Sequence, residues 1–390
     1  MKSPSSTPEL FRGISRNVAL LGGVSFLADV SSEMLYPVIP LFLTAGLGAP
    51  VAAVGIIEGA GEATASIVKG ASGVWSDRVG KRKPFVIAGY SLSAISKPLF
   101  ALVGAWWGVL AVRLIDRLGK GVRSTARDAL IADSTAPAGR GRAFGFHRSV
   151  DQAGGVIGPL LALPILATFE GNYRALFLAA FLPVACGVLL LTLVRDMAPA
   201  PRQAVRVDQR TAFPPAFRRL RLAMLVFSLG NSSNQFLLLR AKEMGLSDSA
   251  AVALFAVYNL STVCAAFPSG LLADRWGRRG MLMASLVVFA AAYTGFAFAS
   301  AAWMAWPLMI LYGFYSGASD GLVKAIAVDC VPAESRGAAL GSIAMVTGLA
   351  AFAASVAAGW IWQVAGSQWA FLMGAAGAAS GFVLLTTVRR

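Results

Sequence analysis

Charged residues are scarce in this chain of 390 residues, and their scarcity excludes an ordinary water-soluble fold. Only 14% of the residues are Asp, Glu, Lys or Arg, whereas 57% are hydrophobic. Soluble globular domains carry about 25% charged residues. The solvent for most of this chain is therefore expected to be a lipid bilayer and not water.

Cysteine and histidine are also scarce, which argues against a disulfide framework or a metal centre. The chain has three cysteines and one histidine, and Cys186, Cys264 and Cys330 are too widely separated for metal-ligand spacing. The LGKG stretch at 118–121 is only a fragment of a phosphate loop, because the upstream Gly and the following Ser or Thr are missing. We therefore expect neither an enzyme nor a cofactor.

Long apolar runs are what the chain does have, and they recur from one end to the other. Each run is about 20 residues long, which allows an α-helix to cross the ~30 Å hydrocarbon core of a bilayer. Twelve runs are found, at residues 18–45, 51–74, 84–103, 105–130, 142–168, 173–194, 219–243, 248–272, 280–300, 303–328, 337–363 and 368–388. The sequence thus predicts an all-α membrane protein with twelve transmembrane helices.

The net charge of +15 indicates membrane topology and not a nucleic-acid partner. Lys and Arg gather near both chain ends and in the loops that follow even-numbered runs, whereas the opposite loops hold only Arg174 and Lys242. Basic loops mark the cytoplasmic side of a membrane protein. We expect a multi-pass protein of a bacterial inner membrane with both termini cytoplasmic, in contact with anionic lipid and without a nucleic-acid partner.

Two internal repeats divide the chain into similar halves. GVWSDRVGKRK at 73–83 returns as GLLADRWGRRG at 270–280, and DSTAPAGRGRAFG at 133–145 returns as DCVPAESRGAALG at 329–341. Parallel repeats of six spans imply two bundles that rock around a site between them.

The segment between the halves is rich in Pro and Arg and reads as a linker. The predicted organisation is a six-helix bundle at 1–194, a cytoplasmic linker at 195–217 and a second six-helix bundle at 218–390.

The repeated loop resembles the loop 2–3 signature of the major facilitator superfamily of secondary transporters, G-x-L-x-D-R-x-G-R-R/K. The matching charged positions are Asp77, Arg78 and Lys81 in the first copy, and Asp274 and Arg278 in the second. The resemblance implies two pseudo-symmetric six-helix bundles. It also implies that the Asp of this loop docks on the other bundle and holds the outward-facing state.

Further gating candidates lie near this loop and in the fifth span. Lys81 is expected to bridge to Asp128 or Asp133. GGVIGPLLA at 154–162 is similar to the span-5 antiporter motif G-x-x-x-G-P of the superfamily. Its matching residues are Gly154, Gly158 and Pro159; close helix packing is the alternative role for them.

Three rows of polar residues stand at helical spacing inside the predicted spans of the first half. The rows are Asp29, Glu33 and Tyr36 in span 1, Glu58 and Glu62 in span 2, and Arg113, Asp116 and Arg117 in span 4. Charges at membrane depth face one another or a cavity and mark functional sites. Since spans 1 and 4 of the superfamily line the central cavity, the resemblance implies that these rows meet there.

Asp29 and Glu33 are the expected proton carriers, with Asp151 as the second choice. A carboxyl group withdrawn from water binds a proton more readily, and a nearby Arg opposes this. Asp29 is the first hypothesis for the partner of Arg113, with Glu33, Glu58 or Glu62 as alternatives. A static scaffold of salt bridges is the competing interpretation of the whole set.

The remaining rows are expected to bind the transported solute. In the second half, Asn231, Asn234 and Gln235 occupy the repeat of Asp29–Glu33 and could hydrogen-bond a solute or join helices. The superfamily's span-4 motif continues from its Arg into uncharged residues, whereas this chain has Asp116, Arg117 and Lys120. That departure argues against a lipophilic drug as substrate.

Together these patterns predict a monomeric secondary transporter that exports a small polar or charged organic solute by proton-coupled antiport. Two alternatives stay open. One is a symporter or facilitator that imports an organic anion held by the span-4 cations. The other is a non-transporting receptor or scaffold on the same fold.

Overall fold

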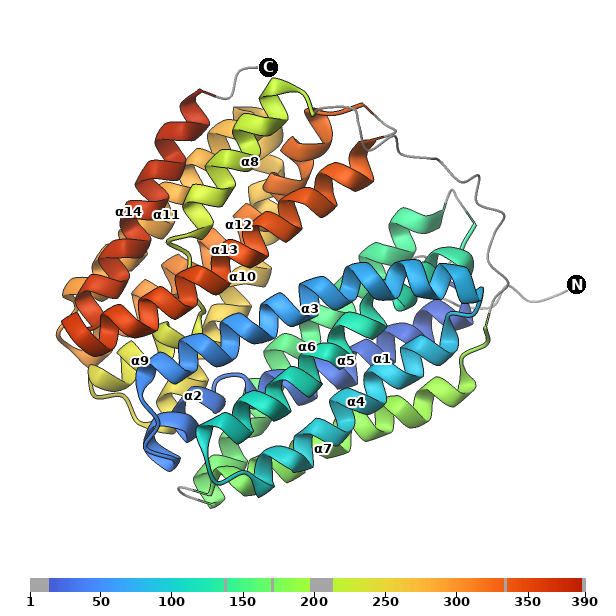
Figure 1. The fold of residues 1–390 in the computed structure, drawn as a ribbon, viewed down its shortest axis with the longest axis horizontal. Coiled ribbons are helices and arrows are strands. Elements are labelled where there is room, and N and C mark those ends of the chain that lie inside the picture. Colours follow the sequence, from blue (N-terminus) through green and yellow to red (C-terminus); the bar gives the residue numbers. More distant parts are fainter. Residues whose placement is uncertain (1–13, 137–138, 170–171, 197–212, 333–334, 388–390) are drawn as a thin grey trace, which may run out of the picture.

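The computed structural model describes residues 14–136, 139–169, 172–196, 213–332 and 335–387. Within these ranges every regular element is a helix and no strand occurs, as the apolar runs predict. Figure 1 shows that the helices run roughly lengthwise through two blocks of the molecule.

The helices α1 to α7 pack on one another and are called the first group. Ser15 caps α1 by accepting a hydrogen bond from the backbone N–H of Val18, and Gly80 ends α3 in the left-handed conformation at φ 68°. The group comprises α1 (Arg16–Leu35), α2 (Ile39–Leu41), the π-helical turn η2 (Phe42–Gly46), α3 (Val51–Val79), α4 (Lys83–Leu102), α5 (Trp106–Asp133), α6 (Arg140–Thr168) and α7 (Tyr173–Leu190), followed by the short turn η4 (Leu191–Leu193).

The helices α8 to α14 form the second group, and their order repeats that of the first. A break at residues 229–234 divides its first long apolar run into two helices. The group comprises α8 (Pro215–Ser228), α9 (Gln235–Glu243), α10 (Asp248–Trp276), α11 (Arg278–Phe298), the turn η5 (Ala302–Met304), α12 (Ala305–Asp329), α13 (Arg336–Ala365) and α14 (Ser367–Thr386).

Nine helical stretches among the described residues are long and apolar enough to cross a membrane. The three predicted spans outside this set differ from the rest in plain ways. α5 carries many charges, α8 and α9 are each too short because of the break between them, and α12 carries several tyrosines, serines and glycines. The structure thus supports a multi-pass membrane protein, while the number twelve stays a prediction.

The two groups touch where α3 packs against α13 and α6 packs against α10. Glycines allow the backbones to meet on α3: a Cβ atom added at Gly55 would lie 2.1 Å from the carbonyl oxygen of Ser355, and one at Gly59 would lie 2.5 Å from the ring of Phe352. Such distances are far below van der Waals contact. We call this end of the molecule, which includes residues 36–59 and 233–259, the closed end.

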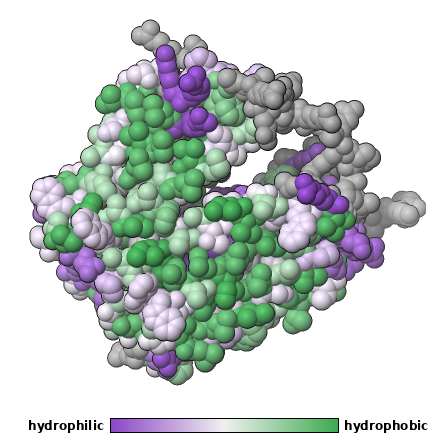
Figure 2. Space-filling view, viewed as in Figure 1, coloured by the Kyte–Doolittle hydropathy of each residue, from purple (hydrophilic) through white to green (hydrophobic). Residues whose placement is uncertain are grey.

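At the other end the groups diverge. Figure 1 shows α1 beginning and α14 ending on the two separated arms, and the space-filling view in Figure 2 shows an opening between them. We call this the open end. Much of the remaining surface in that view is apolar, as a lipid-facing surface must be.

The glycine contact predicts that Gly55→Ala weakens the closed end. Overpacking of a tight contact costs about 1–3 kcal/mol, which lowers the ratio of closed to open molecules at this end by about fivefold or more. The measurement is the distance distribution between spin labels at Ala45 and Gln368, both exposed, in a background without native cysteines.

Gly70→Ala is the matched control, because Gly70 lies on the same helix and a Cβ there would meet nothing within 4 Å. Identical distance distributions for the two variants would show that the Gly55 contact does not hold this end shut.

Candidate functional site

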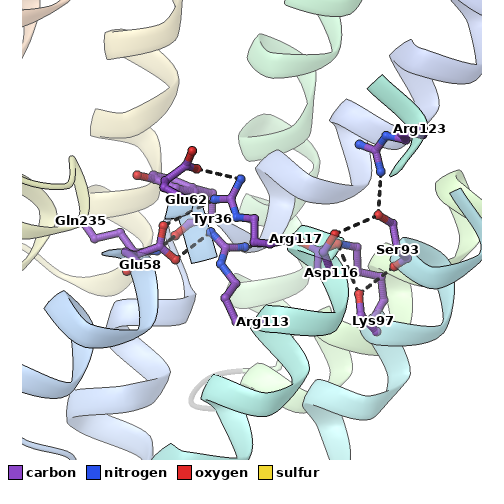
Figure 3. A network of polar contacts seen from close by, with 11 residues as sticks. Tyr36, Glu58, Glu62, Ser93, Lys97, Arg113, Asp116, Arg117, Arg123 and Gln235 are labelled. Carbon is purple, nitrogen blue, oxygen red and sulfur yellow. Dashed lines mark hydrogen bonds and ion pairs between the residues drawn. The ribbon is translucent and has the colours of Figure 1, made fainter. Parts of the chain in front are cut away.

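A row of charged side chains on α5 faces a second row on α3 (Figure 3). Arg113 and Arg117 stand one turn apart on α5, opposite Glu58 and Glu62 on α3. Nη2 of Arg113 lies 2.7 Å from Oε1 of Glu58, and Nη1 of Arg117 lies 2.9 Å from Oε1 of Glu62. The hypothesis that Arg113 pairs with Asp29 is therefore wrong, because α3 and not α1 supplies its partner.

Glu58 is the centre of this set. Nη2 of Arg117 also approaches it, at 3.5 Å from Oε2. The side chain of Glu58 is 2% exposed and that of Arg113 is 3% exposed, whereas half of the Glu62 side chain is exposed. A buried carboxylate between two guanidinium groups is locked, because removing one partner leaves an uncompensated charge away from water.

Asp116 faces α4 and not the opening between the groups (Figure 3). Its Oδ1 atom lies 2.9 Å from Nζ of Lys97 and accepts a hydrogen bond from the Ser96 hydroxyl at 3.3 Å. Nη1 of Arg113 lies 3.6 Å from Oδ2. Asp116 and Lys97 are both buried. Asp116 thus links α4 to α5, and its predicted contact with a solute is not supported by its position.

Arg123, one turn beyond Lys120 on α5, also points at α4. Its Nη1 donates to the Ser93 hydroxyl at 2.6 Å, and its guanidinium lies 4.4 Å from the centre of the Tyr90 ring. This contact extends the scaffold between the two helices. Lys120 itself is exposed, and among the described residues it has no ion-pair partner.

Asp29 and Glu33 on α1 stand apart from these ion pairs. Within the described part of the chain no Lys or Arg forms an ion pair with either carboxylate, and both side chains are partly exposed. The Asp29 carboxyl group lies in the electrostatic field of four other charged groups, Glu33, Asp151, Lys120 and Arg123. The two carboxyl groups are therefore available to bind a proton or a solute.

The antiporter-like motif of α6 lies directly against these two positions. A Cβ atom added at Gly154 would lie 3.0 Å from Cβ of Asp29, and one added at Gly158 would lie 2.9 Å from Cβ of Glu33. Pro159 is buried beside them. The motif thus brings α6 close to α1 at the height of these two carboxyl groups, a contact that the alternative role in close helix packing also predicts.

Asp151 lies one turn before Gly154 on the same helix. Its Oδ1 atom is buried and has no hydrogen-bond partner among the described residues. The charge of Asp151 also affects the Asp29 carboxyl group electrostatically. The three predicted proton-carrying acids therefore gather around one contact between α1 and α6.

Tyr36 connects the charged rows to the second group. The guanidinium of Arg113 lies 5.8 Å from the centre of its ring, and the ring stacks on Phe255 of α10 at 5.1 Å. Its hydroxyl lies 3.4 Å from the Ser233 hydroxyl, and Nε2 of Gln235 donates to its carbonyl oxygen at 3.4 Å. Tyr36 and Gln235 thus form part of the closed end.

Asn234 is held inside the second group by two tyrosines. Its amide donates to the Tyr258 hydroxyl at 3.0 Å and accepts from the Tyr312 hydroxyl at 2.6 Å. Asn231 lies half-buried in the break between α8 and α9. Neither Tyr258 nor Tyr312 was predicted from the sequence. The signal was present, because a tyrosine in an apolar span needs a partner for its hydroxyl.

At the open end, an ion pair within each group holds the loop that carries the repeated signature. Nε of Arg82 lies 3.7 Å from Oδ2 of Asp133, and Nη1 of Arg278 lies 2.7 Å from Oδ2 of Asp329. Asp133 and Asp329 occupy equivalent positions in the two repeats. The partner of Asp133 is therefore Arg82, in place of the predicted Lys81.

Among the side chains that the structure describes at this end, the other charged gating candidates form no ion pair or hydrogen bond across the groups. Asp128 pairs with Arg127 at 2.9 Å, and Arg78 and Lys81 are exposed. The side chains of Asp77 and Asp274 fall outside the described residues, so their predicted docking stays a prediction.

Comparison with known proteins adds independent information. The family model of the Major Facilitator Superfamily matches residues 21–240 and 222–390. An uncharacterised MFS-type transporter of Methanocaldococcus jannaschii is 33% identical over 384 residues, covering 96% of this chain and 95% of that protein. The class C tetracycline resistance protein of Escherichia coli is 26% identical over 339 residues, covering 82% of each.

Among solved structures, a mutant of the nucleoside transporter NupG shares the fold. The two chains superimpose with a TM-score of 0.80 at 15% identity, covering 96% of this chain and 100% of that one.

The position of Glu58 predicts a large difference between two neighbouring acids. Glu58→Gln leaves Arg113 buried with one partner fewer and should lower the free energy of unfolding by about 3–5 kcal/mol. Glu62→Gln removes a half-exposed partner and should cost no more than about 1 kcal/mol. Denaturant unfolding in mixed micelles measures both, and equal losses would contradict the assignment of Glu58 as the locked centre.

Proposed function

Because the chain belongs to the Major Facilitator Superfamily and is one of its transporters, we propose that it exchanges protons for a small polar or charged organic solute by alternating access. Two groups of helices that touch at one end and separate at the other suit this mechanism, since access to a site between them depends on which end is closed.

The proposed architecture is twelve spans in two bundles, at 1–194 and 218–390, joined by a linker at 195–217. The packing of the helices into two groups supports it, as do the internal repeats. α5 can be a span despite its charges because Arg113 and Arg117 turn toward acids of α3 and away from lipid. α8 and α9 together would make one interrupted span.

The proposed orientation places both termini in the cytoplasm of a bacterial cell. The support is the distribution of Lys and Arg, which favours cytoplasmic loops at the end where α1 begins and α14 ends. In that orientation the open end faces the cytoplasm, and the structure corresponds to an inward-facing state.

The observation that carries proton coupling is the unpaired state of Asp29 and Glu33. Other acids of the first group, Glu58 and Asp116, are each held by nearby cations. A carboxyl group without a cation partner, beside a path that changes its access to water, can bind a proton in one state and release it in the other. The contact of these residues with the α6 motif would make the change of access depend on how α1 and α6 move.

Efflux is the proposed direction, and the solute would bind where the two groups face each other. Candidate contacts are Asp29, Glu62 and Tyr36 from the first group and Asn231 from the second. The similarity to a tetracycline resistance protein supports export. At 26% identity it suggests no particular solute for this chain.

Import of an organic anion by symport or facilitated diffusion is the second candidate. The observation that favours it is Lys120, an exposed cation on the α5 row with no ion-pair partner among the described residues. Arg113 and Arg117 are less available for an anion, because Glu58 and Glu62 already occupy them.

Everted membrane vesicles test the proposal with a mixture of candidate solutes, so the transported solute need not be identified first. Respiration acidifies the vesicle lumen and quenches an acridine dye, and a library of polar organic solutes is then added outside. An antiport substrate should restore fluorescence, because protons leave the lumen as the solute enters. A symported anion or a facilitator substrate should not restore it, and no response to any solute would contradict proton antiport.

For the solute that responds, Asp29→Asn should reduce the fluorescence recovery to that of vesicles without the transporter. The physical reason is that an amide cannot carry the exchanged proton. Glu243→Gln is the matched control, because Glu243 lies at the closed end and pairs with Arg240 at 2.9 Å. Recovery that survives Asp29→Asn at equal protein levels would transfer the proton-carrying role to another acid.

A further inference from the structure

His147, the only histidine of the chain, sits in a buried polar network where α1, α4, α5 and α6 meet. His147 on α6 is 4% exposed, and its Nε2 atom lies 2.8 Å from the hydroxyl of Ser25 on α1. That hydroxyl also lies 2.8 Å from the hydroxyl of Tyr90 on α4 and accepts from Nη1 of Arg127 on α5 at 3.2 Å. Side chains from four helices thus meet at one serine oxygen.

Counting donors and acceptors shows that this network can run in two directions. A serine hydroxyl has one proton and two lone pairs, and Arg127 uses one lone pair. Ser25 can therefore donate to His147 while Tyr90 donates to Ser25, or His147 can donate to Ser25 while Ser25 donates to Tyr90. The first arrangement suits an imidazole with bare Nε2, and the second suits one with Nε2 protonated.

Either protonation state of His147 consequently keeps its hydrogen bond to Ser25. A backbone carbonyl can only accept a hydrogen bond, so an imidazole nitrogen that faced one would have to keep its proton. Loss of that proton would leave a buried polar group without a partner, which costs free energy. The hydroxyl groups of Ser25 and Tyr90 remove this restriction, because each can either donate or accept. The network is suited to a side chain that gains and loses a proton.

The neighbourhood of His147 connects it to the acids of the transport site. The charged groups that face it are Asp151 and Arg148 on its own helix and Arg127 and Asp128 on α5; α4 contributes Tyr90. Asp151 is one turn along α6, acts on Asp29 as well, and has a buried Oδ1 without a hydrogen-bond partner among the described residues. Asp151 thus lies within electrostatic range of both Asp29 and His147.

We propose that His147 relays protons between the carboxyl groups of α1 and the open end, with the Ser25 hydroxyl reversing its direction to accommodate each state. One proton leaves the Asp29 carboxyl, binds the Asp151 carboxylate, passes to the imidazole and leaves from there toward the end where α6 begins (Figure 1). After one proton has passed, the Asp151 carboxylate and the neutral imidazole are restored, and Asp29 stays deprotonated until it binds its next proton. This inference rests on the proposed proton coupling.

The first test observes the imidazole directly. Because the chain contains one histidine, protein labelled with ¹⁵N-histidine and purified through a histidine-free tag gives the nitrogen signals of His147 alone. Between about pH 8 and pH 5 in lipid nanodiscs, we expect both neutral tautomers of the imidazole to be populated, because either one keeps its hydrogen bond to Ser25, while the fold is retained. Ser25→Ala should change the balance of the two neutral tautomers. An imidazole that stays neutral in one tautomer throughout this range would overturn the proposal.

The second test measures rates with protons as the only probe. After a pH jump, proton uptake by purified transporter is followed with an indicator dye. His147→Gln keeps a side chain that can hydrogen-bond Ser25 but cannot relay a proton, so uptake should slow by about tenfold or more. Ser93→Ala is the matched control, since Ser93 is a buried hydroxyl in the neighbouring contact with Arg123 and should leave the rate unchanged.

The acids provide the comparison that separates the two proposals. One outcome is that the double variant Asp29→Asn, Glu33→Gln no longer takes up protons after the pH jump, while His147→Gln takes them up at the wild-type rate. In that case the relay is wrong and proton coupling stands. If the double variant takes up as many protons as the wild type, the proposed coupling through α1 fails. Slower uptake in His147→Gln at the wild-type melting temperature, with Ser93→Ala unchanged, supports the relay.

Discussion

The salt bridge between Arg113 and Glu58, with Arg117 closing on the same carboxylate, is the constraint on which the first group depends. It allows α5, the most charged helix of the group, to lie against α3 among otherwise apolar helices. A buried ion pair is a weak source of stability, but its failure is expensive. α3 is also the helix whose glycines meet α13 at the closed end, so the pairing positions the surface through which the two groups touch.

This constraint divides the charges into two sets with different physics. Glu58 and Asp116 are surrounded by cations and belong to the framework, whereas Asp29 and Glu33 have no ion-pair partner among the described residues. Tyr36 lies between the sets, since it is covered by Arg113 and stacks on Phe255 of the second group. A change at the charged rows would therefore be felt at the closed end through one aromatic ring.

Much of the fold was predictable because apolar length is a local property. The run predicted at 368–388 corresponds to α14 (Ser367–Thr386), and the helical spacing of Arg113 and Arg117 correctly placed both on one face. The partner of Arg113 was not predictable, because Asp29, Glu33, Glu58 and Glu62 have the same chemistry and only the packing of α5 on α3 selects among them. The break at residues 229–234 was missed for a similar reason, since the tyrosines that hold the Asn234 side chain come from helices distant in the sequence.

The division between framework charges and proton-carrying charges can be measured by infrared difference spectroscopy on the transporter in lipid at two pH values. The account predicts that the band of protonated carboxyl groups in the difference spectrum loses intensity in Asp29→Asn and in Glu33→Gln. It also predicts that Asp116→Asn, at a buried acid paired with Lys97, leaves the band unchanged. A band that survives both α1 substitutions and disappears with Asp116→Asn would contradict the account, because the framework acids would then be the ones that exchange protons.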